Sequence, residues 1–324
     1  MRICIFGAGA IGGFIAGYMA RAGIEVSVVA RGAHLAAIRA KGLTVETRDE
    51  TFNVRVHASD DPRELGVQDG VFVTVKAPAL PSVAQGIAPL LAAETPVAFL
   101  TNGVPWWYFH GHGGPWDGRR IPSLDPDDII WKAIGPARTV GGIAWPASTV
   151  PEPGTIRLTD PRSRPTILGA PDGSDMPGIR VLEQALKTAG LPVVVDSKIR
   201  DRIWEKLAFN LSAGPMCVLT ETPVRATHEE EVLIETSRRV LAEAGALIAA
   251  LGRTADLQVE RTVGINMNLA HRPSVLQDLL ARRPMETDSL YNVPLELAAL
   301  TGVRMPTLEL LAALIRVKVR ALGL

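Results

Sequence analysis

Residues 2–30 read RICIFGAGAIGGFIAGYMARAGIEVSVVA, and this stretch predicts one strand–helix–strand unit. The β-favouring run RICIF is followed at once by glycines and then by an apolar helical stretch over residues 11–22. Gly23 ends that helix, and residues 25–30 form a second strand. A glycine-rich connection at this place is typical of a dinucleotide-binding α/β domain.

The glycines of this unit, Gly7-Ala8-Gly9-Ala10-Ile11-Gly12, match the pattern GxGxxG. Gly7 permits a tight turn, Gly9 leaves the backbone open to a pyrophosphate, and Gly12 lets the helix pack closely on the strand. The helix N-terminus offers free N–H groups and a partial positive charge to the phosphates. The alternative, a tightly packed turn that binds nothing, suits this context poorly.

The residues at the end of the second strand indicate whether the dinucleotide is NAD or NADP. NAD sites usually place Asp or Glu there for the ribose 2′-hydroxyl, whereas this sequence has Ala30 and Arg31. Arg31 can pair with a 2′-phosphate, and no carboxylate is present to repel it. We therefore predict NADP (NADPH) as the cofactor, against the alternative of a solvated arginine at a strand end.

The rest of residues 1–196 continues to alternate strands with helices. We expect strands over residues 52–56, 71–75, 97–100, 139–145, 155–158, 166–168 and 193–195, and helices over residues 34–41, 81–93 and 179–189. This alternation predicts an α/β Rossmann-type, doubly wound domain with a mainly parallel sheet and helices on both faces. Residues 105–138 interrupt it with glycines, prolines and four of the six tryptophans.

After Asp196 the pattern changes to helices alone. We expect helices over residues 197–213, 229–251, 254–266, 274–282 and 287–300, and a last one after Pro306. The sequence therefore predicts two domains, an NADP-binding Rossmann-like domain over residues 1–196 and an all-α domain over residues 197–324.

Composition excludes several classes of protein. Lys plus Arg and Asp plus Glu both total 34, so no basic excess indicates a nucleic-acid binder. No apolar run reaches the roughly 20 residues that span a bilayer, and the first apolar stretch lacks the basic leader and cleavage site of a signal peptide. Two cysteines, Cys4 and Cys217, cannot staple a chain of 324 residues, so we expect reduced core residues and a soluble, cytoplasmic protein.

A polar pair interrupts the apolar face of the helix expected after Asp196. Lys206 and Asn210 are four residues apart and share a face, and Asn210 projects between the directions of Ile199 and Ile203. Polar groups on a buried face need partners. The pair is either a snorkelling lysine with a hydrogen-bonded structural asparagine, or it faces a cleft between the two domains.

Further polar residues lie where ligands could be bound. Lys76 and Asn102-Gly103 follow two sheet strands, at the edge where doubly wound folds bind ligands, although Asn102-Gly103 also suits a simple turn. Ser274 and Asp278 share a helix face, and Glu286 lies near the start of the next helix. Alternatively, Ser274 is a helix cap, Asp278 is a solvated acid, and Glu286 interacts with the positive end of a helix.

Two patterns leave the function open. His110-x-His112 has no clear third ligand, so we predict no metal site. The aromatic run over residues 106–109 suits a substrate lid, a dimer contact or a local core equally well.

Together these motifs resemble the ketopantoate reductase family (2-dehydropantoate 2-reductase) over most of the chain. The resemblance rests on GAGAIGG at residues 7–13, Arg31, VKA at 75–77, TNG at 101–103, WEKL at 204–207 with Asn210, and SVLQD at 274–278 with Glu286 and Asp288. The last two motifs are the specific ones, because many dehydrogenases share the glycine loop. The helical domain is also similar to those of 6-phosphogluconate and glycerol-3-phosphate dehydrogenases, but Lys206, Ser274 and Glu286 favour the first family.

The resemblance implies NADPH-dependent reduction of a 2-oxo acid, first of all of 2-dehydropantoate (ketopantoate) to pantoate in pantothenate biosynthesis. It also implies Lys206 as the general acid at the ketone, with Glu286 assisting it or the substrate hydroxyl. An ammonium there would stabilise and protonate the negative charge that hydride delivery builds on oxygen. The implied substrate contacts are Asn102, Asn210 and Ser274. The implied cofactor contacts are Gly7, Ala8, Gly9, Ala10, Ile11, Gly12, Arg31, Lys76 and Asn102. A homodimer through the helical domain is expected by analogy.

Three features depart from the family pattern. Gly214 and His271 stand where the family often has asparagine, and the insert over residues 105–138 is longer than expected. They leave open which 2-oxo acid is the substrate and in which direction the reaction runs. The competing hypotheses are an enzyme for another 2-oxo or 2-hydroxy acid on the same scaffold and a non-catalytic NADP sensor. Lys206, Asn210, Ser274 and Glu286 together argue against the sensor.

Overall fold

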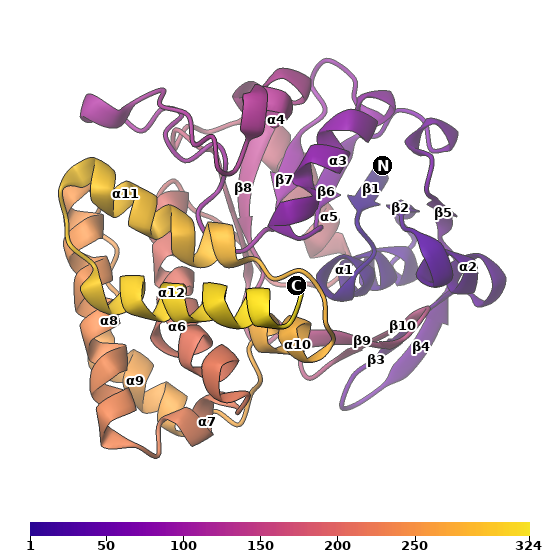
Figure 1. The fold of residues 1–324 in the computed structure, drawn as a ribbon. Helices are drawn as coiled ribbons and strands as arrows, with labels where there is room; N and C mark the ends of the chain where they lie inside the picture. Colours follow the sequence, from indigo (N-terminus) through magenta and orange to yellow (C-terminus); the bar gives the residue numbers. More distant parts are fainter. The chain divides into compact units, whose positions relative to one another are not determined.

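Two units make up the protein in the computed structural model, which describes residues 1–324. The first unit consists of Met1–Thr101 and Trp106–Ile199, and the second of Asn102–Pro105 and Arg200–Leu324. Figure 1 shows the first unit in indigo to pink and the helices of the second in orange to yellow. The short segment Asn102–Pro105 therefore belongs to the second unit although it directly follows a strand of the first.

The first unit is built on an eight-stranded sheet with the order β12-β11-β8-β7-β6-β1-β2-β5. Its strands are β1 (Arg2–Phe6), β2 (Glu25–Val29), β5 (His57–Ser59), β6 (Gly70–Val73), β7 (Val97–Phe99), β8 (Thr139–Ile143), β11 (Thr166–Gly169) and β12 (Val193–Val195). Neighbouring strands run parallel except that β11 is antiparallel to β8. The predicted fold class, a Rossmann-type unit with a mainly parallel sheet, is confirmed.

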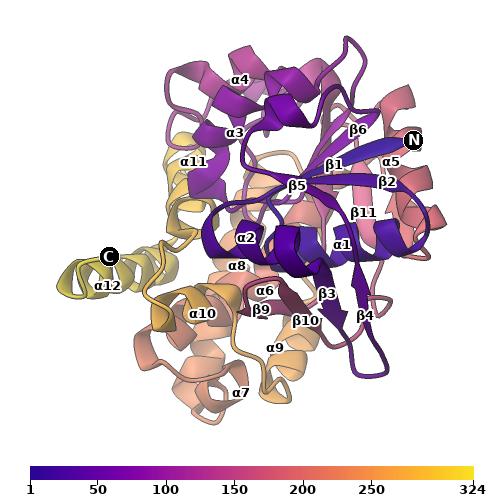
Figure 2. The same cartoon turned by 90° about the vertical axis from the view of Figure 1, so that its right-hand side faces the viewer.

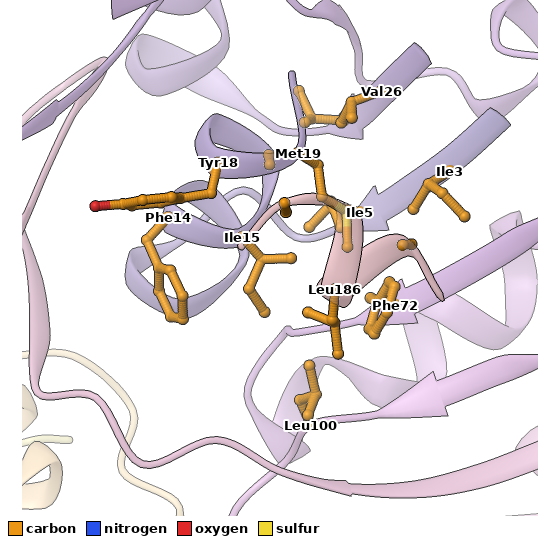
Figure 3. Packing of buried hydrophobic residues seen from close by; sticks show 14 of the residues in the cluster. Ile3, Ile5, Phe14, Ile15, Tyr18, Met19, Val26, Phe72, Leu100 and Leu186 are labelled. Atoms are coloured by element: carbon orange, nitrogen blue, oxygen red, sulfur yellow. The ribbon is translucent and has the colours of Figure 1, made fainter. Parts of the chain in front are cut away.

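Helices cover both faces of this sheet. They are α1 (Ala10–Arg21), α2 (Gly32–Lys41), α3 (Leu80–Gly86), α4 (Ile129–Ala133) and α5 (Pro177–Thr188). Helices α1 and α5 contact one another, as do α3 and α4. The core under α1 and α5 contains Ile3 and Ile5 of β1, two residues apart and therefore on one face of the sheet, opposite Ile15 of α1 and Leu186 of α5 (Figure 3).

A second sheet packs on the opposite side of α1, with the order β4-β3-β10-β9. Its strands are β3 (Leu43–Glu46), β4 (Thr51–Val54), β9 (Ser148–Glu152) and β10 (Thr155–Leu158). Figure 2 shows α1 between the two sheets. A Cβ on Gly13 would lie 2.5 Å from Cδ1 of Ile156, and one on Gly17 would collide with Cγ2 of Val45. Glycines on this face of α1 thus let the second sheet approach the helix.

The expectation of a single sheet is therefore wrong. The runs at residues 52–56 and 155–158 form β4 and β10 of the second sheet, and the short strands β3, β5 and β9 were not expected. The expected helix over residues 81–93 ends at Gly86, and a 3-10 turn, Ala88–Leu90, follows it. Pro89 lies in this turn and disfavours continuation of the α-helix.

The Trp-rich insert contributes a local aromatic core to the first unit. Trp106, Trp107, Tyr108 and Phe109 are all buried. The Trp106 ring lies edge-on to Phe99 of β7 and to Trp131 of α4, at centroid distances of 5.6 and 5.7 Å. Of the three interpretations of the run over residues 106–109, these contacts favour the local core.

The second unit is all-helical, as expected. Its helices are α6 (Ile199–Thr220), α7 (Val224–Thr227), α8 (Glu231–Ala250), α9 (Val259–Met267), α10 (Ser274–Leu280), a π-helix over Asp288–Asn292, α11 (Val293–Thr301) and α12 (Pro306–Ala321). Helix α6 does not end at residue 213 but continues through Pro215. Residues 211–218 are buried throughout, so packing outweighs the roughly 3 kcal/mol that an internal proline costs.

Three further observations bear on the expectations from composition. Cys4 and Cys217 are both free and buried, which confirms that they are reduced core residues. No helix combines the length and the apolar character needed to cross a membrane. No group of three or more His, Cys, Asp or Glu side chains is arranged to hold a metal ion.

Candidate active site

The glycine loop of the first unit leaves the N-terminus of α1 open. Gly7 has φ +108°, a value that favours glycine, and a Cβ there would lie 2.6 Å from Cγ1 of Val75. A Cβ on Gly12 would collide with the Gly7 carbonyl and with Thr74, whereas one on Gly9, the N-cap residue, would meet no atom within 4 Å. The loop is therefore closely packed at Gly7 and Gly12 and open at Gly9, which fits the approach of a diphosphate.

Hydrogen bonds hold this loop in place from two neighbouring strands. The backbone N–H groups of Gly7 and Ala8 both donate to the Val29 carbonyl of β2, at 3.0 and 3.2 Å. The hydroxyl of Thr74, just beyond β6, donates to the Gly7 carbonyl at 2.6 Å. The first turn of α1 is thus fixed before any ligand binds, which lowers the ordering cost of binding.

Two basic residues of the first unit lie at the carboxyl ends of its strands. Arg31 follows β2, is the N-cap residue of α2 and is exposed. Lys76 follows β6, precedes a 3-10 turn and is also exposed. Both occupy the strand ends where doubly wound folds bind their ligands.

In the second unit, α6 carries Lys206 and Asn210 on one face. Both residues are half-buried, and the neighbouring Trp204 and Leu207 are buried and anchor the helix. Desolvation lowers the pKa of Lys206 from 10.5 to about 8, while the negative charge of Glu286 opposes this shift. A lysine with such a pKa can exchange a proton near neutral pH.

Glu286 is held by a residue from a distant part of the chain. Its carboxylate is buried, and Oε2 accepts a hydrogen bond from Nδ2 of Asn102 at 3.1 Å. The Asn102 segment is fastened to the region after Glu286, because Val104 N–H donates to the Ser289 carbonyl at 3.0 Å. Gly103 has φ +82°, and a Cβ there would collide with the Ser289 backbone, so Asn102-Gly103 is a docked turn rather than a simple one.

The remaining residues singled out in the second unit differ in their surroundings. Ser274 is the first residue of α10 and is half-buried. Asp278 is buried and forms an ion pair with Arg283 at 3.2 Å, so its interpretation as a solvated acid is wrong. This pairing gives Asp278 a structural role at the end of α10.

The departure from the family pattern at Gly214 has a steric reason. Gly214 lies on α6 one turn beyond Asn210, and a Cβ there would lie 2.5 Å from Oη of Tyr291. Tyr291 is buried, its hydroxyl has no hydrogen-bond partner, and burial raises the pKa of its phenol. An asparagine at position 214 would therefore not fit beside Tyr291.

The structure thus assembles two groups of side chains, one in each unit. In the second unit Lys206, Glu286 and Asn102 form one electrostatic and hydrogen-bonded group, with Asn210 one turn from Lys206. In the first unit the glycine loop, Arg31 and Lys76 lie at the ends of β1, β2 and β6. His34 and Tyr291 were not among the residues expected from the sequence. A histidine three residues after Arg31, in the first turn of α2, is the signal that could have drawn attention to His34.

Fold and side chains define a class: a Rossmann-type unit joined to a helical unit that holds a buried glutamate beside a half-buried lysine and a half-buried asparagine. Two family models match the chain, "Ketopantoate reductase PanE/ApbA" over residues 3–173 and "Ketopantoate reductase PanE/ApbA C terminal" over residues 198–319. The chain belongs to the ketopantoate reductase family. The expected resemblance is confirmed.

Individual proteins agree with this assignment over the whole length. A 2-dehydropantoate 2-reductase from Mesorhizobium japonicum is 41% identical over 318 residues, which cover 98% of this chain and 97% of the relative. The crystal structure described as that of a ketopantoate reductase from Ralstonia solanacearum MolK2 matches with a TM-score of 0.93 and 36% identity, covering 100% of this chain and 99% of the other. A PanE/ApbA family ketopantoate reductase from Ralstonia eutropha JMP134 matches with a TM-score of 0.83 and 26% identity, covering 98% of both chains.

Proposed function

We propose that this protein is an NADPH-dependent reductase that converts 2-dehydropantoate (ketopantoate) to pantoate, a step of pantothenate biosynthesis. One observation carries the proposal beyond family membership: a lysine with its pKa lowered to about 8 stands in the field of a buried glutamate that Asn102 holds by a hydrogen bond. At neutral pH most Lys206 side chains are protonated. Lys206 can therefore donate the proton that reduction of a ketone consumes.

Residues 1–196 form the cofactor domain in this proposal. Gly7, Ala8, Gly9, Ala10, Ile11 and Gly12 offer the open N-terminus of α1 to the diphosphate, and the space beside Gly9 supports that assignment. Arg31 takes the 2′-phosphate, which selects NADPH over NADH, and Lys76 and Asn102 contact the cofactor. When bound, NADPH supplies a hydride for the keto carbon. We also propose that the protein is cytoplasmic.

Residues 197–324 supply the acid and most of the substrate contacts. The Lys206 ammonium stabilises the negative charge that develops on the ketone oxygen and transfers a proton to it. Glu286 favours the protonated form of Lys206 through its charge, which keeps the acid available. Asn102, Asn210 and Ser274 bind the polar groups of the 2-oxo acid. The proposal requires the ketone to meet both the nicotinamide and the Lys206 amino group.

The same domain forms a homodimer in this proposal, through α12. Leu310, Leu314 and Val317 are exposed large apolar residues of this helix, spaced so that they share one face. Exposed Glu309 and Arg320 lie near its opposite ends. A second copy of α12 in antiparallel orientation would cover the apolar stripe with an identical one and bring opposite charges together at both ends.

A substrate panel tests the proposed activity. The purified protein is mixed with NADPH and, in separate reactions, with ketopantoate, 3,3-dimethyl-2-oxobutanoate, 2-oxoisovalerate and phenylglyoxylate, and the loss of NADPH absorbance is followed. We expect kcat/KM to be highest for ketopantoate. Preference for another acid would support the enzyme of a different 2-oxo acid on the same scaffold. Dinucleotide binding without turnover of any acid would favour the NADP sensor.

A further inference from the structure

His34 connects the glycine loop to the second sheet. It lies in the first turn of α2, half-buried, and its Nε2 is 2.7 Å from the Ala8 carbonyl oxygen. Its Nδ1 is 2.9 Å from the backbone nitrogen of Gly154, in the turn between β9 and β10. All three residues belong to the first unit.

These two contacts determine the protonation state of the imidazole. A backbone N–H can only donate, so Nδ1 must accept from Gly154, and a carbonyl can only accept, so Nε2 must carry the proton. His34 is therefore neutral when both hydrogen bonds form. Desolvation lowers the pKa of His34 below its ordinary value, against the opposing effect of the Ala8 hydrogen bond, which favours this neutral form at physiological pH.

The bond to Ala8 also fixes the direction of the next N–H group. In a planar trans peptide the carbonyl of Ala8 and the N–H of Gly9 point in opposite directions. The Gly9 N–H has no acceptor within the protein, and the space beside the Gly9 Cα is open. An imidazole that holds the Ala8 carbonyl on one side thus turns the Gly9 N–H outward on the other.

We propose that His34 is a positioning residue for the cofactor's diphosphate, because it locks the Ala8–Gly9 peptide with the Gly9 N–H directed at the bound diphosphate. The inference rests on the proposed use of a dinucleotide. His34 itself does not touch the cofactor in this role. It lies three residues from Arg31, so the two residues divide the work on one helix: Arg31 takes the 2′-phosphate and His34 orients the loop for the diphosphate.

Substitution of His34 by glutamine or by asparagine distinguishes the effects of its two hydrogen bonds, because each amide can retain only one of them. His34→Gln places an N–H donor near the position of Nε2 and can retain the bond to Ala8. His34→Asn places an amide oxygen near the position of Nδ1, so it can retain the Gly154 bond but loses the one to Ala8. One lost hydrogen bond corresponds to a change in affinity of about three- to tenfold.

The test measures binding by calorimetry, without substrate, for NADPH, NADH and 2′-AMP. We expect His34→Asn to weaken NADPH and NADH alike by about three- to tenfold and to leave 2′-AMP, which lacks the diphosphate, unchanged. His34→Gln should bind all three nearly as the unchanged protein does. Thermal unfolding of both variants accompanies the titrations.

Each other outcome has a definite meaning. An equal loss for all three ligands in His34→Asn would show that His34 only supports the structure of α2, and wild-type affinities in that variant would show that the Ala8 bond does not matter. Either result overturns the inference and leaves the proposed function standing. If the unchanged protein binds neither dinucleotide, the proposed function fails, and the role of His34 fails with it.

Discussion

Asn102 donates a hydrogen bond from Nδ2 to Oε2 of Glu286 at 3.1 Å, across 184 positions of the sequence. A buried carboxylate needs such partners, since desolvation would otherwise drive it toward its neutral form. The bond uses one of the two N–H donors of Asn102, so its second N–H and its carbonyl stay available to a ligand. Asn102 can therefore orient Glu286 and bind a ligand at the same time.

The first prediction concerns the proposed acid. Lys206→Ala removes the ammonium that in our proposal protonates the ketone oxygen, so we expect kcat to fall about 10²–10⁴-fold. The dissociation constant of NADPH, from fluorescence titration, should not change. Lys198→Ala, at an exposed lysine just before α6, is the matched control and should keep wild-type turnover. A Lys206→Ala enzyme with normal kcat would refute the assignment.

The second prediction concerns the pH profile of ketone reduction. In our proposal Lys206 donates a proton to the ketone, which it can do only below its pKa of about 8, so kcat/KM should fall about tenfold per pH unit above that value. The charge of Glu286 raises this pKa, so Glu286→Gln should move the alkaline limb of the profile to lower pH. Glu205→Gln, next to Lys206 in sequence but paired with Arg202, should leave the limb in place. A limb that does not move in Glu286→Gln would contradict the coupling.

Part of this site could be predicted from the sequence because the signals are local. The glycine loop and Arg31 each lie at a strand–helix junction of one local unit, and Lys206 and Asn210 lie one turn apart on α6, so sequence spacing sets their geometry. The partnership of Asn102 with Glu286 depends on a docked turn at Gly103 and on the second unit's packing, and no periodicity encodes it. From the sequence, only the resemblance to the family assigns both Asn102 and Glu286 to a functional site.

The second sheet escaped prediction for a related reason. Its strands have four or five residues, and β9 is mostly exposed and contains Pro151, which weakens the strand pattern. The informative residues were Gly13 and Gly17, on the face of α1 that contacts Ile156 and Val45. A pattern of glycines shows that something packs closely, but it does not show which segment does so.

The third prediction concerns the choice of dinucleotide. Arg31→Ala removes the charge-assisted hydrogen bonds that we propose to the 2′-phosphate, worth about 1.5–3 kcal/mol, so NADPH affinity should fall roughly ten- to a hundredfold. NADH affinity should stay the same, because NADH has no phosphate at that position. Calorimetric titration of both dinucleotides measures the two effects. Equal affinities for NADPH and NADH in the unchanged protein would contradict the role of Arg31.

The fourth prediction concerns the close contact between α6 and Tyr291. Gly214→Ala places a Cβ 2.5 Å from Oη of Tyr291, and we expect overpacking to lower the free energy of unfolding by about 1–3 kcal/mol. Tyr291→Phe removes the buried, unpartnered oxygen, so it should restore most of that loss in the double variant. Urea denaturation measures the free energy of unfolding of the two single variants and the double variant, each compared with the unchanged protein.

A second glycine provides the control for helix propensity. Gly245 lies in α8, and a Cβ there would meet no atom within 4 Å. Gly245→Ala should therefore stabilise the protein by roughly 0.5–1 kcal/mol. If Gly214→Ala stabilised the protein by a similar amount, the steric explanation for the missing asparagine would be wrong.

The last prediction concerns assembly through α12. Because Leu310, Leu314 and Val317 expose a continuous apolar face, light scattering should give about twice the monomer mass of 34.6 kDa. Leu314→Glu places a charge in the middle of the stripe, so burying it against a second copy becomes unfavourable and the protein should become monomeric. Val232→Glu is the control, since Val232 is 76% exposed on α8, outside the stripe, and this variant should stay dimeric. A dimer that persists in Leu314→Glu would place the interface elsewhere, and a monomeric unchanged protein would rule it out.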